Sequence, residues 1–86
     1  MMGSIHDGLL EIYVLKAVND APTYCFALAD YLGTRAMSVR RVLHHLEEQG
    51  YLTSQKHWRQ FNYSITEKGK AELKLRQAEM RIKGGV

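Results

Sequence analysis

The sequence predicts a mostly α-helical fold with one small β-hairpin. Apolar residues recur at spacings of three and four along several segments, which is the pattern of a helix with one buried face. Residues 61–65 instead alternate apolar with polar side chains, as a half-buried strand does. The chain has 86 residues, a length that suits one domain. We therefore expect residues 1–86 to form a single domain with a helical core and a hairpin.

The first predicted helix runs from about Ile5 to Val18 and is apolar on more than one side. One face of this helix carries Leu10, Tyr13, Val14, Ala17 and Val18. Leu9, Ile12 and Leu15 lie off that face, and a surface helix with one packing partner is rarely so apolar all round. Either the helix is central in the fold, or another subunit covers part of it.

The next two predicted helices are short and nearly continuous. Pro22 marks a break, and Thr23 is a plausible N-cap for a helix that ends at about Leu32. Gly33 permits a tight turn into a third helix, from about Ala36 to Gln49, before Gly50. The third helix is predicted to bury one stripe, because apolar residues recur three, four and seven positions after the first of them, at Val39, Val42, Leu43 and Leu46.

A hairpin and a last helix complete the chain. Residues 51–56 and 61–65 are predicted strands, joined by residues 57–60, which lack the Asn-Gly or Gly-rich signal of a tight turn. Thr66 is expected to cap a helix from Glu67 to about Lys83. Residues 84–86 are expected to be a frayed end.

The last predicted helix is apolar on two opposite sides. Leu73 and Met80 fall on one side, and a seam with steps of 4, 3 and 4 falls on the other, at Ala71, Leu75, Ala78 and Ile82. One side can pack on its own domain, so we expect Leu75, Ala78 and Ile82 to pair two subunits in a homodimer. The alternative is a helix that frays after Leu75.

The charge of the chain is unevenly distributed. Residues 1–33 hold one lysine against four acidic residues, whereas residues 34–65 hold five basic residues against two acidic ones. Residues 66–86 hold six basic residues against three acidic ones. Basic charge that begins with the third helix is what a surface facing phosphates needs, although a solvated surface can show the same pattern.

A helix pair joined by a short Gly-containing turn, with a basic second helix, is typical of a helix-turn-helix. The major groove of DNA is about 12 Å wide and admits one helix. We expect the third helix to contact double-stranded DNA through Arg35, Met37, Ser38, Arg40, Arg41, His44 and His45. We expect the hairpin to contact it through Lys56, Trp58 and Arg59.

The expected roles of these side chains differ. One of Arg40 and Arg41 is suited to a bidentate contact with guanine, and the other to a phosphate. Met37 is equally suited to touch a thymine methyl group or to fill the core. For Trp58, folding back onto the hairpin is favoured slightly over packing against the sugar-phosphate backbone.

The sequence also resembles the winged-helix core of the MarR and PadR transcriptional regulators. Residues 28–33 read LADYLG, residues 46–52 read LEEQGYL, and residues 65–70 read ITEKGK, in the order and spacing of those families. The resemblance implies a winged helix-turn-helix with a three-helix core, a two-stranded wing and a C-terminal helix. Arg35 stands where those families place a Ser or Thr cap. Because Arg cannot accept hydrogen bonds, Thr34 is the alternative cap.

Other classes of function find little support in the sequence. It contains no paired-carboxylate motif, phosphate-binding glycine loop or Ser/His/Asp order, so we expect no enzyme activity and no cofactor. His44 and His45 are consecutive and diverge on a helix, and the single Cys25 is expected to be inert packing, so no metal site is predicted. No apolar run is long enough for a membrane span, no secretory signal is evident, and the cytoplasm is the expected compartment.

The sequence therefore predicts a small prokaryotic or phage transcriptional regulator, repressor-like, that binds specific double-stranded DNA as a dimer. Two alternatives remain open at this point. The first is a winged-helix module for protein–protein contact, and the second is a nonspecific architectural DNA-binding protein. The sequence assigns no small-molecule effector.

Overall fold

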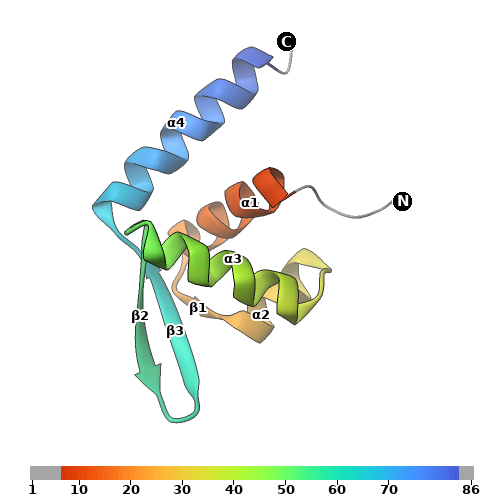
Figure 1. Ribbon diagram of the computed structural model, residues 1–86, viewed down its shortest axis with the longest axis vertical. Helices are drawn as coiled ribbons and strands as arrows, with labels where there is room; N and C mark the ends of the chain where they lie inside the picture. The colour runs from red at the N-terminus through yellow and green to blue at the C-terminus, as the bar shows by residue number, and fades with distance from the viewer. Residues whose placement is uncertain (1–6, 84–86) are drawn as a thin grey trace.

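The computed structural model describes residues 7–83 and has four helices and a small antiparallel sheet in that range (Figure 1). The elements in chain order are α1 (Asp7–Asp20), β1 (Thr23–Tyr24), α2 (Cys25–Leu32), α3 (Ala36–Glu48), β2 (Leu52–His57), β3 (Gln60–Ile65) and α4 (Glu67–Lys83). The predicted order of helices and hairpin is confirmed. The predicted start of the first helix at Ile5, and the frayed end at residues 84–86, lie outside the described residues.

Helix α1 is central, because it packs against α2, α3, α4 and β3. Its predicted face is buried at Leu10, Val14 and Val18, but Leu15 is fully buried as well. The alternative that this helix is central in the fold is therefore confirmed, since Leu15 lies off the predicted face and is nevertheless covered by neighbouring elements. Leu9 and Tyr13 remain exposed.

The sheet has a third strand that the sequence did not predict. Thr23 and Tyr24 form β1, which pairs with β3 opposite Tyr63 and Asn62 and gives the strand order β1-β3-β2. The N-cap of α2 is consequently Tyr24, whose side chain makes no capping hydrogen bond. The prediction of Thr23 as the cap is wrong, because α2 begins at Cys25 and Thr23 lies one residue before the cap position.

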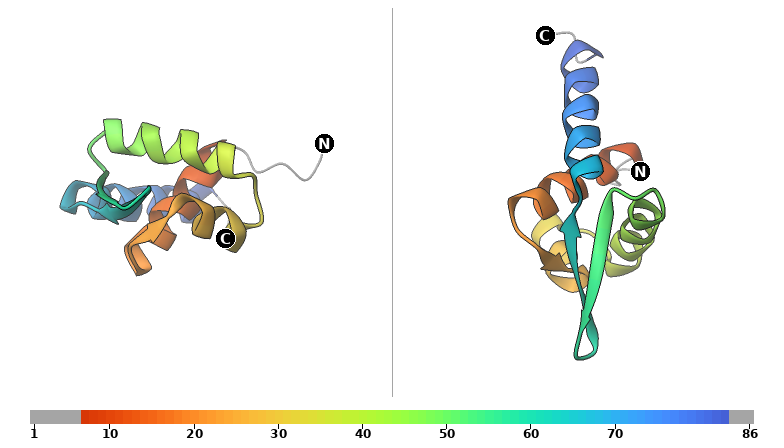
Figure 2. Two further views of the ribbon diagram at one scale, coloured as in Figure 1. Left: turned by 90° about the horizontal axis from the view of Figure 1, so that it is seen from below. Right: turned by 90° about the vertical axis from the view of Figure 1, so that its left-hand side faces the viewer.

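The hairpin of β2 and β3 extends away from the helical core, and α4 projects at the opposite end of the long axis (Figures 1 and 2). Paired residues run from Leu52 opposite Ile65 to His57 opposite Gln60. The link is thus a two-residue turn of Trp58 and Arg59, and the predicted four-residue link at 57–60 is too long.

The start of α4 is fixed against the turn between α3 and β2. The hydroxyl of Thr66 accepts a hydrogen bond from the Gly69 amide at 3.0 Å, which confirms Thr66 as a cap, and donates to the Gly50 carbonyl at 2.7 Å. Lys68 Nζ donates to the Gln49 carbonyl at 2.9 Å. A Cβ at Gly69 would lie 2.7 Å from Ile65 Cγ1 and nearer still to the Tyr51 carbonyl oxygen. The close approach of α4 to this turn therefore requires glycine.

Candidate nucleic-acid interface

The buried stripe of α3 determines which of its sides faces outward. Val39, Val42, Leu43 and Leu46 are buried, with relative exposures of 0 to 7%, as the sequence predicts. The opposite side is open to solvent. Arg35, Met37, Arg40, Arg41, His44 and His45 are exposed, whereas Ser38 is half-buried. Met37 is 72% exposed, so its predicted alternative as core filler is wrong.

The beginning of α3 is set by backbone contacts rather than by a side-chain cap. Gly33 has a left-handed conformation (φ 67°), and the following amide of Thr34 donates to the Ala29 carbonyl at 3.0 Å. Arg35 occupies the N-cap position with extended backbone and no capping hydrogen bond. The alternative of Thr34 as the cap is therefore wrong. Cys25 Sγ, half-buried, donates to the Ala36 carbonyl at 3.4 Å and helps to hold this end of the helix.

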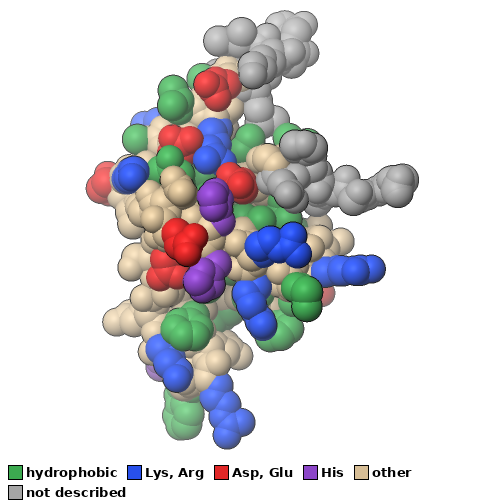
Figure 3. Space-filling model, viewed as in Figure 1, with side chains coloured by type: hydrophobic (Ala, Val, Ile, Leu, Met, Phe, Trp, Pro, Cys, Tyr) green, Lys and Arg blue, Asp and Glu red, His purple; other side chains and the backbone are tan. Residues whose placement is uncertain are grey.

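The cations of α3 and the hairpin differ in their partners from three of the cations of α1 and α4. In the described part of the chain, Lys16, Lys70 and Arg76 each form an ion pair with a carboxylate of α1 or α4. None of the five basic residues between positions 34 and 65 does so. These residues are Arg35, Arg40, Arg41, Lys56 and Arg59. Figure 3 shows Lys and Arg side chains gathered over the first turns of α3 and at the end of the hairpin.

The turn of the hairpin presents its side chains outward. Trp58 is 85% exposed, and its backbone has a positive φ of 61°. The favoured prediction that Trp58 folds back onto the hairpin is therefore wrong. Lys56 and Arg59 are also exposed.

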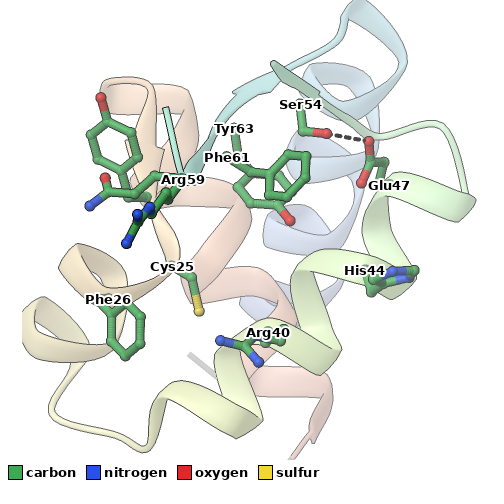
Figure 4. A pocket seen from close by; sticks show the side chains of 11 residues that line it. Cys25, Phe26, Arg40, His44, Glu47, Ser54, Arg59, Phe61 and Tyr63 are labelled. Atoms are coloured by element: carbon green, nitrogen blue, oxygen red, sulfur yellow. Dashed lines mark hydrogen bonds between the residues drawn. The ribbon is translucent and has the colours of Figure 1, made fainter. Parts of the chain in front are cut away.

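A groove separates α3 from the hairpin, with a volume of about 570 Å³. Arg40 and His44 of α3 line it, together with Arg59 and Phe61 of the hairpin and Phe26 of α2. In Figure 4, Arg40 and Cys25 lie on one side of the groove, and Phe61 and Tyr63 on the other. The fold thus brings Arg40 and Arg59 to one groove, although they are far apart in the sequence.

The floor of this groove includes a polar contact between helix and hairpin. Ser54 donates a hydrogen bond of 2.7 Å to the carboxylate of Glu47 (Figure 4). Burial raises the pKa of the nearby Tyr63 hydroxyl, and the charge of Glu47 adds to this effect. Phe26, Phe61 and Tyr63 line the groove, although the sequence did not predict them as site residues. The period-two pattern of β3 was the available signal for Phe61 and Tyr63, since it places both on one face.

His45, on the exposed side of α3, lies near a carboxylate of the neighbouring helix α1. Its Nε2 lies 3.9 Å from a carboxylate oxygen of Glu11 on α1. The other oxygen of Glu11 accepts a 2.6 Å hydrogen bond from Arg76 of α4, which also donates to Glu72 at 2.7 Å. The Arg76 guanidinium lies 5.7 Å from the ring centroid of Tyr51. The hydrogen bonds of Arg76 fix α4 to α1.

The two apolar sides of α4 have different environments. Leu73 is buried against the domain, whereas Leu75 is 57% exposed and Ala78 is exposed. This agrees with a seam that points away from the core. The side chains of Ile82 and Met80, which belong to the same prediction, lie outside the described residues.

Residues 7–83 hold neither a metal-binding cluster nor a membrane-spanning helix. No group of three or more His, Cys, Asp or Glu side chains there is arranged to hold a metal ion. No helix in the same range has the length and apolar character that crossing a membrane requires.

Comparison of the sequence with protein-family models and with curated proteins finds no match. Comparison of the structure finds close matches among solved proteins. The Streptococcus mutans protein smu.1704 superposes with a TM-score of 0.82 at 22% identity, over 98% of this chain and 87% of that one. A transcriptional regulator from Clostridium thermocellum has a TM-score of 0.82 at 17% identity, over 90% and 84%.

A longer protein also matches. The transcriptional regulator BldR from Sulfolobus solfataricus has a TM-score of 0.73 at 22% identity, over 91% of this chain and 62% of that one. The chain therefore spans less than two thirds of BldR. At these identities the likeness concerns the fold. The predicted winged helix-turn-helix fold is confirmed: the chain shares the fold of these solved proteins, two of which are transcriptional regulators, with α2 and α3 as the helix pair and β2–β3 as the wing.

Proposed function

We propose that the chain binds double-stranded DNA sequence-specifically and regulates transcription. The observation that carries this proposal is the set of five unpaired basic residues on α3 and the wing. Phosphate binding needs cations that are not already neutralised, and Lys16, Lys70 and Arg76 are therefore poor candidates. Lys68 and Lys74 also form no ion pair within the described residues, but they lie on α4 rather than on α3 or the wing. The likeness to solved transcriptional regulators supports the same function.

The groove suggests how a duplex lies on this surface. With the exposed side of α3 in the major groove, a DNA strand passes between α3 and the wing, where Arg40 and Arg59 face it from both sides. Arg41 lies on the exposed side of α3 outside that groove, and we assign it to base edges. A guanidinium can bond guanine O6 and N7 together, which makes Arg41 the main determinant of specificity.

We further propose that the protein is a homodimer formed through α4. Leu75 and Ala78 are exposed on the projecting helix, and Leu9 and Tyr13 leave apolar surface exposed on α1. A second copy of the chain would cover the seam of α4 by symmetry. A two-fold dimer presents two α3 helices to successive major grooves, so the DNA site is pseudo-palindromic. A protein that acts on chromosomal DNA of a prokaryote or phage works in the cytoplasm.

The binding test is a titration of labelled duplex monitored by fluorescence anisotropy at several salt concentrations. We expect affinity to fall steeply with salt, and Arg41→Ala to weaken binding to the preferred sequence by about 1–3 kcal/mol. Lys16→Ala is the matched control, because Lys16 lies on α1 and pairs with Asp20. Unchanged binding by Arg41→Ala at matched salt would contradict the assigned face. Equal competition by random duplex would favour a nonspecific architectural role.

The dimer test is sedimentation equilibrium. We expect the unaltered chain to sediment as a dimer at micromolar concentration and Leu75→Glu to sediment as a monomer, since the charge would be buried in the seam. Lys74→Glu is the control, an exposed neighbour on the same helix but off the seam. A monomer at high micromolar concentration for the unaltered chain would refute the dimer.

A further inference from the structure

Trp58 lies at a position where a tryptophan side chain adds little to the packing of the fold. Its side chain is 85% exposed, so it contributes little to the core or to packing across the hairpin. It occupies the first position of the two-residue turn, with φ at 61°. Turns of this kind favour Gly, Asn or Asp, because a bulky side chain is strained at positive φ. The residue therefore costs the fold stability.

The surroundings of Trp58 indicate the chemistry of its partner. Residues 51–65 contain no acidic side chain, and Lys56, His57 and Arg59 flank the indole. A partner of this tip must be anionic and must offer a flat or apolar surface to the ring. The grooves of a DNA duplex meet both conditions, since phosphates border the sugars and base edges.

We propose that Trp58 is an apolar wedge that enters the minor groove and packs against its sugars and base edges. This inference rests on the duplex binding proposed above. With α3 in the major groove and one DNA strand between α3 and the wing, the tip of the hairpin reaches the neighbouring minor groove. Arg59 holds the bordering phosphates, and the indole excludes water from the groove. The contact in the bound complex, rather than the stability of the fold, then accounts for a bulky side chain at this strained position.

The experiment compares the unaltered chain with Trp58→Gly. Glycine accepts positive φ freely, so we expect the melting temperature to rise by about 5 °C. We expect the affinity for a 30-base-pair random-sequence duplex to fall by roughly tenfold or more. The slope of affinity against salt should stay the same, because no cation is removed. Arg59→Ala serves as the comparison, because it removes a cation and should reduce the slope of log affinity against log salt concentration by about one. Trp58→Phe should retain most of the affinity.

Fluorescence gives a direct readout, since Trp58 is the single tryptophan of the chain. We expect saturating duplex to quench its emission and to shield it from acrylamide. Unchanged emission with bound duplex, or full affinity of Trp58→Gly, would overturn the inference while leaving DNA binding intact. Failure of the unaltered chain to bind any duplex would overturn both. A blue shift with phosphatidylserine vesicles and no response to duplex would assign the tip to a membrane surface instead. If Trp58→Gly does not fold, Trp58→Asn replaces it, because Asn also tolerates positive φ.

Discussion

Gly69→Ala tests how closely α4 packs against the turn between α3 and β2, because we expect it to destabilise the protein, whereas this substitution in a helix usually stabilises one. Replacing an exposed glycine inside a helix by alanine normally stabilises a protein by about 1 kcal/mol. Gly69, however, is buried, and its added Cβ would lie 2.7 Å from Ile65 and closer to the Tyr51 carbonyl. Because the nearest atom belongs to the backbone, relief requires α4 to move away from the turn between α3 and β2.

The cost follows from the contacts that such a movement disturbs. Overpacking costs about 1–3 kcal/mol. Movement of α4 also strains the hydrogen bonds from Thr66 to Gly50 and from Lys68 to Gln49, each of which contributes about 1 kcal/mol. After subtracting the gain in helix propensity, we expect a net loss of about 2–3 kcal/mol. In a domain of this size that lowers the melting temperature by roughly 10–15 °C.

Thermal unfolding followed by circular dichroism measures this loss, at one fixed chain concentration so that dimerisation does not shift the result. Lys70→Ala is the control on the same turn of α4, since Lys70 is exposed and its pair with Glu67 is a surface pair. We expect the control to change the melting temperature little. A Gly69→Ala protein as stable as the control would refute the described approach of α4 to Tyr51.

Two further predictions concern the contacts between elements. Arg76→Met should lower the free energy of unfolding, measured by urea denaturation, by about 1–3 kcal/mol, because Glu11 and Glu72 lose a partner that is only one-fifth exposed. Lys70→Met, which breaks an exposed pair, is the control. An effect of Arg76→Met no larger than that of the control would contradict this prediction. Tyr63→Phe should lessen the alkaline loss of stability. Burial raises the pKa of Tyr63 above 10.0 in the folded chain, so the neutral hydroxyl contributes fully to the free energy of unfolding below that pH. This contribution falls as the pH rises through the folded pKa. If both proteins lose the same free energy of unfolding between about pH 9 and about pH 11, the prediction is wrong.

The fold could be predicted where the pattern was local. The stripe of α3 repeats every three to four residues, so Val39 and Leu43 could be assigned to the core from sequence. Strand β1 could not, because two residues have no periodicity and its pairing with β3 depends on contacts 40 residues apart. The all-round apolar character of the first helix indicated that something covers Leu15, but the sequence left open whether other elements of the fold or a second subunit does so.

The exposed side of α3 could be predicted from the sequence, whereas the groove between α3 and the hairpin could not. The charge boundary at Arg35 predicts that the segment from the third helix onward is the one that would face an anion. The groove joins α2, α3 and β3, and only tertiary packing brings Phe26 close to Phe61. The turn was misjudged because Trp58 stands where glycine or asparagine would have signalled a two-residue hairpin. That missing signal is the same feature that indicates a function for Trp58.

The central claim, that this winged helix binds specific duplex DNA through α3, is tested most directly by selection of bound sequences from a random duplex library. We predict enrichment of a pseudo-palindromic site whose half-sites are about one helical turn apart. Selection with Arg41→Ala should relax the preference at one base pair in each half-site and leave the spacing unchanged. A library that emerges without enrichment, from a folded protein at moderate salt, would contradict the claim.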